Sequence, residues 1–238
     1  VGWDHDPPYY VMEYLENGSL EDWIRSREEL SVMQCVTVMR EIAEGLSFAH
    51  GKGVLHCDLK PANVLLDHSF HPRLADFGQG RVVGDQTASL GTLFYMAPEQ
   101  ANLQSSPDVT WDVYGLGAIA YTMLVGVPPY RTPETLESLE SASSLQDRLQ
   151  KYQQLIRATP KPSMHHRRRG VDKPLAQIID RCLHVNPERR YQNIQQVIGA
   201  LDSRQRARNR RPIYVLGLIG PILLMSLMLF FSMRSRMV

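Results

Sequence analysis

Apolar residues recur every three or four positions between residues 32 and 46, which is the period of an α-helix with one buried face. Ser31 and Gln34 form a capping-box pattern at the start of this stretch, and Gly51 and Gly53 follow His50 at its end. The pattern therefore predicts a long amphipathic helix whose apolar stripe is core. The stripe consists of Val32, Cys35, Val36, Met39, Ile42, Ala43 and Leu46.

Short β-branched and aromatic runs lie on both sides of this helix. Residues 9–14 read Tyr-Tyr-Val-Met-Glu-Tyr, which is typical of a buried strand, and Asn17-Gly18 ends the run. Ser19 then begins a short helix, because a hydroxyl cap is followed by early acidic residues. We also predict short strands at 54–56 and 64–66.

The second half of the chain is mainly helical. An apolar helix opens at Asp112 and runs through Leu124, and Pro128-Pro129 ends it. Leucines among charges predict an amphipathic helix over residues 133–157. Two closing helices are expected at 175–183 and 194–201. The His-His-Arg-Arg-Arg-Gly run at 165–170 is interpreted as a solvated basic loop rather than as a specific phosphate site.

Composition and charge place the chain among ordinary folded proteins. Of its 238 residues, 43% are hydrophobic and 21% are charged, which allows one good-sized core. The net charge of +1 gives no argument for nucleic-acid binding. Cys35, Cys57 and Cys182 form no C-x-x-C pair, which favours a reduced cytosolic setting over a disulfide framework.

Three short strings carry the chemical information. They are His-Cys-Asp-Leu-Lys-Pro-Ala-Asn at 56–63, Ala-Asp-Phe-Gly at 75–78 and Ala-Pro-Glu at 97–99. They match, in order, the H-R-D-L-x-x-x-N, D-F-G and A-P-E parts of the protein-kinase signature. The chain resembles the serine/threonine protein kinases of the Hanks, or eukaryotic-like, superfamily.

The resemblance implies an α+β fold, the mainly helical C-terminal lobe of a kinase with short strands at the catalytic loop and the hinge. No Gly-rich loop and no V-A-I-K lysine precedes the catalytic loop, so we expect this chain to lack the small lobe and not to turn over ATP at kinase rates. The expected division is as follows: end of small lobe and hinge, 1–18; C-terminal lobe, 19–201; basic juxtamembrane segment, 202–212; transmembrane helix, 213–233; tail, 234–238.

The resemblance also implies catalytic roles. Asp58 corresponds to the aspartate that orients the substrate hydroxyl or accepts its proton, and Lys60 would neutralise the transferring phosphate. Asn63 and Asp76 would supply oxygen ligands to Mg²⁺. Thr92 matches the family threonine that bonds to the Asp58–Lys60 pair and shapes the substrate groove.

Adenine recognition is expected at the hinge. The resemblance assigns the Glu13 carbonyl and the Leu15 amide to two hydrogen bonds to adenine, Leu65 to the floor of its pocket, and Met12 to the gate of the back pocket. Met12 and Leu65 can equally be core positions.

Three further residues are expected to hold the lobe together. Asn186-Pro187-Glu188-Arg189-Arg190 resembles the family's D-P-x-x-R, so Glu99 should pair with Arg190. Asp112 should accept backbone hydrogen bonds from the catalytic loop.

Cys57 departs from the family pattern, because it replaces the arginine of H-R-D. That arginine normally binds activation-loop phosphate through a charge-assisted contact. Thr87 and Ser89 lie in the loop where such a phosphate would be placed, and Arg81 is an alternative receiver. The substitution predicts an enzyme whose activity does not depend on phosphorylation of this loop.

The C-terminal stretch is basic and then apolar. Residues 213–231 contain no charged side chain, which is long enough to span a bilayer. More arginines precede the span than follow it, so the positive-inside rule places the lobe in the cytoplasm. The basic cluster is also suited to anionic lipid. It contains Arg204, Arg206, Arg208, Arg210 and Arg211.

Together these features predict an ATP- and Mg²⁺-dependent serine/threonine protein kinase of the bacterial receptor type, anchored by one transmembrane helix and acting on protein hydroxyls. The resemblance leaves a homodimer open. The main alternative is a membrane-anchored pseudokinase that acts as a binding scaffold. A small-molecule kinase is disfavoured by Lys60, Thr92 and the Ala-Pro-Glu string, which together build a peptide groove.

Overall fold

The computed structural model describes residues 11–26, 30–77, 90–209 and Met225. They fall into two compact units with the boundary between Ile198 and Gly199. Except for Met225, the second unit is described only as the end of a helix over 194–209.

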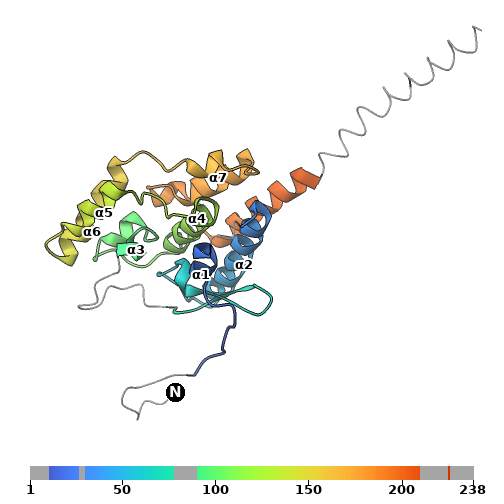
Figure 1. Cartoon of the computed structure of the whole chain (residues 1–238), viewed down its shortest axis with the longest axis horizontal. Helices are drawn as coiled ribbons and strands as arrows, with labels where there is room; N and C mark the ends of the chain where they lie inside the picture. Colours follow the sequence, from blue (N-terminus) through green and yellow to red (C-terminus); the bar gives the residue numbers. More distant parts are fainter. Residues whose placement is uncertain (1–10, 27–29, 78–89, 210–224, 226–238) are drawn as a thin grey trace, which may run out of the picture. The chain divides into compact units, whose positions relative to one another are not determined.

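A helix that is buried on every side forms the centre of the first unit. This helix, α4 (Val109–Val125), begins at Asp108, whose carboxylate accepts a hydrogen bond from the Thr110 N–H, and ends at Gly126 in the left-handed conformation. It packs between α2 (Val32–Gly51) and α7 (Lys173–Cys182) (Figure 1). Because Asp108 provides the cap, α4 begins one turn earlier than the helix predicted from Asp112.

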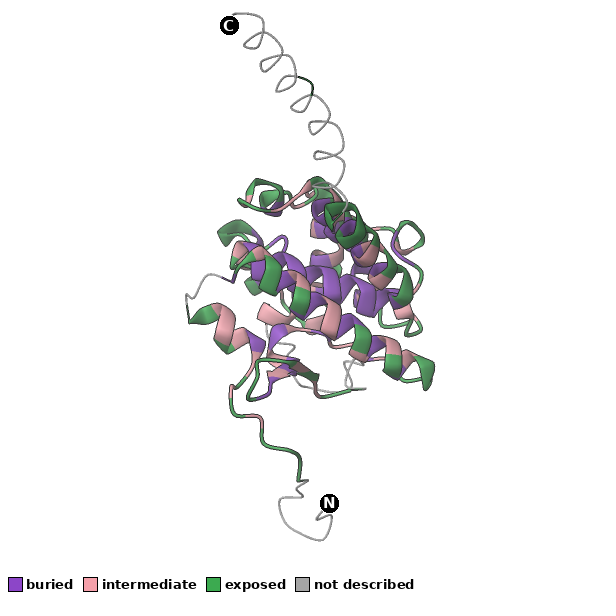
Figure 2. Cartoon of the chain, turned by 90° about the vertical axis from the view of Figure 1, so that its right-hand side faces the viewer, coloured by how far each residue is buried: buried purple, intermediate pink, exposed green. Residues whose placement is uncertain are grey.

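The predicted long helix is confirmed in α2. The Ser31 hydroxyl accepts from the Gln34 N–H, and the Gln34 side chain accepts from the Ser31 N–H, as the capping-box pattern predicted. Five of the seven positions of the apolar stripe lie in the core, where the buried positions gather (Figure 2), and Val32 and Val36 are half-buried. The short helix α1 (Leu20–Arg25) begins in the same way, at Ser19.

The strands form one small sheet. β1 (Val64–Leu66) pairs antiparallel with β2 (Pro72–Leu74), and Val64 lies opposite Leu74. β2 packs against α2, where Gly45 leaves room for the Leu74 side chain. The short 3₁₀ helix η1 (Pro61–Asn63) leads into β1.

Two predicted strands are not formed. Residues 54–56 have no regular structure, because the Val54 N–H donates to the Ala49 carbonyl and the His56 N–H donates to Asp112. Residues 11–14 are the described part of the predicted hinge strand, and they are exposed and irregular. A strand needs a neighbour for its backbone groups, and no other described residue pairs with 11–14.

The amphipathic helix predicted over residues 133–157 is divided into two helices. In place of one helix over 133–157 there are α5 (Pro133–Glu140) and α6 (Leu145–Ala158). Ser144 caps α6, and the Asp147 carboxylate accepts from the Ser143 N–H. Serines that hydrogen-bond to nearby backbone favour helix starts over helix interiors, which explains the break.

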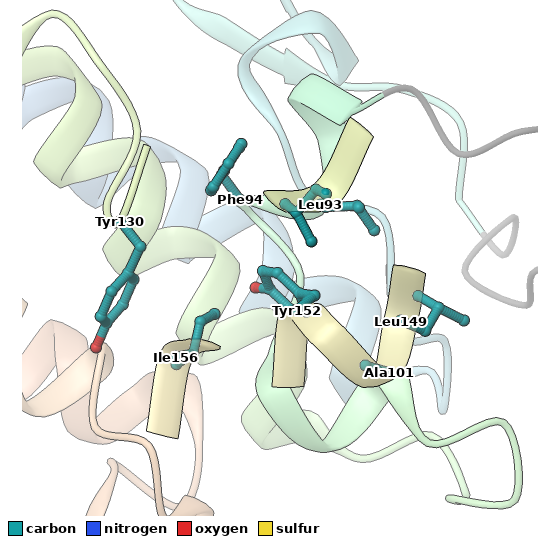
Figure 3. Packing of buried hydrophobic residues seen from close by; sticks show 8 residues of the cluster. Leu93, Phe94, Ala101, Tyr130, Leu149, Tyr152 and Ile156 are labelled. Atoms are coloured by element: carbon teal, nitrogen blue, oxygen red, sulfur yellow. The ribbon is translucent and has the colours of Figure 1, made fainter. Parts of the chain in front are cut away.

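A separate apolar cluster holds α5 and α6 against the segment that contains the Ala-Pro-Glu string (Figure 3). The Tyr152 hydroxyl donates to the Met96 carbonyl, and the Gln153 amide donates to the Pro98 carbonyl at 3.0 Å. The cluster is Leu93, Phe94, Ala101, Tyr130, Leu139, Leu149, Tyr152 and Ile156.

The remaining short elements of the unit are α3 (Leu90–Leu93), η2 (Pro98–Ala101), η3 (Met164–Arg167) and η4 (Pro187–Arg189).

The prediction of a solvated basic loop at 165–170 is wrong at its first position, because His165 is 0% exposed.

In the described part of the chain, no helix is both long enough and apolar enough to cross a bilayer. The segment predicted to do so, 213–233, lies outside the described residues apart from Met225.

Candidate active site

The loop that contains the first sequence string, residues 56–63, is hydrogen-bonded to the central helix α4. The Asp112 carboxylate of α4 accepts from the backbone N–H groups of His56, at 2.9 Å, and Cys57, at 2.8 Å. The same carboxylate lies 2.7 Å from Nε2 of His50, at the end of α2. The predicted role of Asp112 is therefore confirmed, and one buried carboxylate joins α2, α4 and the loop.

Two side chains hold the Asp58 carboxylate, and both donate to the same oxygen. Its Oδ2 accepts from Lys60 Nζ at 2.8 Å and from the Asn63 side-chain amide at 3.0 Å. The Asn63 amide also donates to the Asp58 carbonyl, at 2.9 Å. The Asp58 and Lys60 side chains are 24% and 22% exposed, so the pair is ordered and still open to solvent. The second oxygen, Oδ1, accepts no hydrogen bond from the described residues.

His56 lies beneath this pair and is completely buried. Burial lowers the pKa of its imidazole, although the nearby Asp112 and Asp58 carboxylates act in the opposite direction. Its ring is 4.7 Å from the ring of Phe77, between centroids. The neutral His56 ring therefore joins the catalytic loop to the Asp-Phe-Gly segment.

A backbone hydrogen bond joins the same two segments directly before Asp76. The Ala75 N–H donates to the Asn63 carbonyl at 3.0 Å, so the backbones of the two predicted metal ligands run side by side. Asp76 is exposed and has a positive φ of 59°. A non-glycine residue held in the left-handed region is uncommon and often marks a functional position.

Gln100 and Gly115 also fix the backbone of this loop. The Gln100 amide donates to the Cys57 carbonyl at 2.6 Å. Gly115 of α4 lies against Leu59: a Cβ at this position would be 2.9 Å from Leu59 Cβ and 3.1 Å from its carbonyl oxygen. This close approach requires glycine.

Gly115→Ala should therefore destabilise the protein by about 1–3 kcal/mol, the usual cost of overpacking a core. This loss should appear although alanine favours a helix by up to about 1 kcal/mol over glycine. Gly199→Ala is the matched control, since a Cβ there would meet nothing within 4 Å. Urea unfolding measures both variants. Equal stabilisation by the two substitutions would show that the loop does not need the close approach.

Thr92 lies near Asp58 without bonding to it. Both line one small cavity, together with Cys57, Leu59 and Gly115. Among the described residues, the Thr92 hydroxyl makes no hydrogen bond to Asp58 or Lys60, so the structure does not form the expected contact.

The hinge residues are brought only partly to the site. The backbone beyond them pairs with β1: Asn17 N–H donates to the Leu66 carbonyl, and Leu66 N–H donates to the Gly18 carbonyl. Leu65, the expected adenine floor, is half-buried on β1 and bridges to Ser19. Glu13 is exposed, Leu15 is half-buried, and Met12 is 51% exposed, so Met12 is not a core residue.

The predicted Glu99–Arg190 pair is confirmed. Arg190 is fully buried, and its two terminal nitrogens donate to the two Glu99 oxygens at 2.7 and 2.8 Å. The guanidinium also donates to three backbone carbonyls and lies 5.0 Å from the ring centroid of Tyr114. The pair fixes the Ala-Pro-Glu segment to the end of the lobe.

Two contacts were not predicted from the sequence. His50 looks like the last residue of a helix, and Gln100 simply follows the Ala-Pro-Glu string. Their partners, Asp112 and Cys57, are 62 and 43 residues away. No local pattern signals such contacts; only the position of Gln100 directly after Glu99 places it near the site.

Comparison with known proteins agrees with this geometry. The protein kinase domain family matches residues 3–200, and the chain belongs to that family. The chain is similar to serine/threonine-protein kinase PknB of Mycobacterium tuberculosis H37Rv, with 33% identity over 192 residues, and of Mycobacterium leprae, with 31% over 191 residues. It is also similar to serine/threonine-protein kinase cds1 of Schizosaccharomyces pombe, with 29% identity over 197 residues.

Each match covers 78% of this chain. The matched region is 28% of each of the two PknB proteins and 39% of cds1. The chain therefore corresponds to less than half of the length of these relatives.

Proposed function

We propose that the protein is a serine/threonine protein kinase, which transfers the γ-phosphate of ATP to hydroxyls of protein substrates. The observation that carries the proposal is the Asp58 carboxylate, held by Lys60 and Asn63 with one oxygen left over. Phosphoryl transfer depends mainly on positioning and charge stabilisation. An aspartate fixed in this way can orient a hydroxyl and take its proton.

Lys60 has a second part in this proposal. Its ammonium lies 2.8 Å from Asp58, where it can neutralise the phosphate as it moves toward the substrate hydroxyl. Thr92, on the wall of the same small cavity, would bound the place where the substrate residue lies. A lysine two positions after the aspartate supports serine/threonine over tyrosine substrates.

The donors present fit Mg²⁺. The Asn63 amide uses its nitrogen for both contacts with Asp58, and its oxygen, which accepts no hydrogen bond from the described residues, can bind a cation. Asp76 is exposed and directly follows Ala75, whose N–H donates to the Asn63 carbonyl. Both are hard oxygen ligands of the kind that Mg²⁺ prefers. When bound, the metal would neutralise phosphate charge, and the Glu13 carbonyl, the Leu15 amide and Leu65 would receive the adenine.

The test is transfer of labelled γ-phosphate from ATP to a generic serine/threonine substrate by the full-length gene product. Activity that requires Mg²⁺ and appears on serine and threonine, not tyrosine, supports the proposal. Nucleotide binding without any transfer would favour the scaffold alternative.

We further propose a membrane anchor at 213–233 with the kinase lobe on the cytoplasmic side. The uncharged run and the preceding arginines support it. Three of these arginines lie on the helix 194–209. The protein should remain in the membrane fraction after alkaline carbonate extraction. Release into the supernatant would contradict the anchor.

Regulation should differ from that of kinases with an arginine beside the catalytic aspartate. Burial and the nearby Asp112 raise the pKa of Cys57 to about 12, so its thiol is neutral at pH 7 and gives no charge to a phosphate. Thr87, Ser89 and Arg81 lie outside the described residues.

Thr87→Ala with Ser89→Ala should therefore leave activity within a few-fold of wild type. Thr92→Ala should be severely impaired, because Thr92 lines the same small cavity as Asp58, where the substrate residue is proposed to lie. The measurement is the initial rate before and after phosphatase treatment. A drop of more than about tenfold, roughly 1.4 kcal/mol of barrier, would show that phosphate control survives without the arginine.

A further inference from the structure

Two adjacent histidines and an aspartate meet outside the candidate active site. His165 and His166 belong to η3, and Asp180 belongs to α7, which contacts η3. One ligand atom from each of the three side chains lies within 4.8 Å of the other two. Nothing in the proposed kinase chemistry uses these residues.

The distances suit a tetrahedral metal site. His165 Nε2 lies 3.4 Å from Asp180 Oδ1, and His166 Nε2 lies 3.1 Å from Asp180 Oδ2. Zinc binds nitrogen and oxygen at about 2.0–2.2 Å, so neighbouring ligand atoms of a tetrahedral site are roughly 3.3–3.6 Å apart. Each imidazole nitrogen thus lies close to that spacing from a different oxygen of the Asp180 carboxylate, and one ligand atom from each of the three side chains lies within 4.8 Å of the others.

His165 is held in a fixed position for coordination because its side chain is completely buried. Its ring lies edge-on to Tyr121, at 5.3 Å between centroids.

A proton must sit on Nδ1 when Nε2 binds a metal. Nδ1 of His165 is buried with no hydrogen-bond partner among the described residues. The unsatisfied nitrogen is therefore present in either tautomer, and moving the proton adds no new unpaired group. The Nε2 contact with the Ala176 carbonyl, at 3.4 Å, is long and easily given up.

We propose that His165, His166 and Asp180 bind one divalent transition-metal ion, with zinc as the first candidate and water in the fourth position. Three protein ligands with one open position are usual for zinc. His166 is exposed, so solvent can reach the cluster and supply the water. A bound ion would tie η3 to α7.

Lys161 is the natural competitor of the metal. Its ammonium lies 3.1 Å from Asp180 Oδ1, and its side chain is 46% exposed. A flexible lysine can therefore leave for solvent when a cation binds. The basic neighbours Arg167 and Arg169 raise the local potential, so we expect weaker binding than at a four-ligand structural zinc site.

The test is titration of the EDTA-treated full chain with zinc chloride in mild detergent, followed by calorimetry, in the absence of nucleotide. One equivalent should bind. His166→Ala and Asp180→Asn should each lower the affinity at least tenfold, and Lys161→Met should raise it or leave it unchanged. His68→Ala is the matched control, because His68 is exposed and outside the cluster.

Two further measurements separate this site from others. Cobalt should give the visible bands of a four-coordinate nitrogen and oxygen site without a thiolate charge-transfer band. Asp76→Asn, which alters the proposed Mg²⁺ site, should leave zinc binding unchanged. The proposal fails if folded His166→Ala binds zinc like wild type, if the cobalt spectrum shows thiolate, or if no zinc binds.

Discussion

Asp58→Asn is expected to lower phosphoryl transfer by at least about 10²-fold while nucleotide affinity stays within a few-fold of wild type. A positioned general base contributes roughly 10²–10⁴-fold to rate. Asparagine keeps the size of the side chain but cannot take a proton, and it loses the 2.8 Å ion pair with Lys60. The measurements are the initial transfer rate of the full-length gene product and its Mg·ATP affinity by fluorescent-nucleotide displacement.

Asp76→Asn is the companion variant. Its exposed carboxylate is proposed to bind Mg²⁺, so this substitution should weaken Mg·ATP binding as well as transfer. If both variants lose activity and keep wild-type nucleotide affinity, the division of roles between Asp58 and Asp76 is wrong. Full activity in Asp58→Asn would remove the basis of the proposed chemistry.

Arg190→Ala should lower the free energy of unfolding by about 3–5 kcal/mol, the usual cost of removing one partner of a buried ion pair. The guanidinium is fully buried, forms the two short bonds to Glu99 and also satisfies the carbonyls of Thr110, His184 and Val185. Its loss leaves these acceptors unpaired and a cavity beside Tyr114.

The neighbouring Arg189→Ala is the matched control, because Arg189 is exposed and surface substitutions usually change stability by less than about 0.5 kcal/mol. Urea unfolding of both variants, together with Glu99→Ala and the double variant Glu99→Ala/Arg190→Ala, completes the cycle. The double variant should lose less than the sum of the single losses, since each single change leaves the other member of the pair uncompensated and the double variant leaves neither. Additive losses would show that the pair contributes no coupling.

Local patterns predicted the elements whose causes are local. The Ser31–Gln34 capping box, the apolar stripe of α2 and the glycines after it are close in sequence, and the structure places that helix as predicted. Residues 64–66 form a strand, and α1 begins at Ser19 as expected. The same patterns failed at 133–157, where Ser143 and Ser144 interrupt the leucine stripe with caps of their own.

The predicted strand at 54–56 and the described part, 11–14, of the predicted strand at 9–14 failed for a different reason. Apolar and β-branched runs indicate that a segment can form a strand, but a strand also needs a partner. The His56 N–H is taken by Asp112, and 11–14 find no neighbour among the described residues.

The sequence alone determined the family, the order of the three kinase strings, and the identity of Asp58, Lys60, Asn63 and Asp76 as candidates. It did so because these residues belong to short strings whose spacing is set by one chemistry. Only the tertiary structure decided that His50 and Asp112 join α2 to the catalytic loop, that Thr92 does not bond to Asp58, and that His165 is buried beside Asp180. Those contacts join residues far apart in the chain, so only folding brings them together.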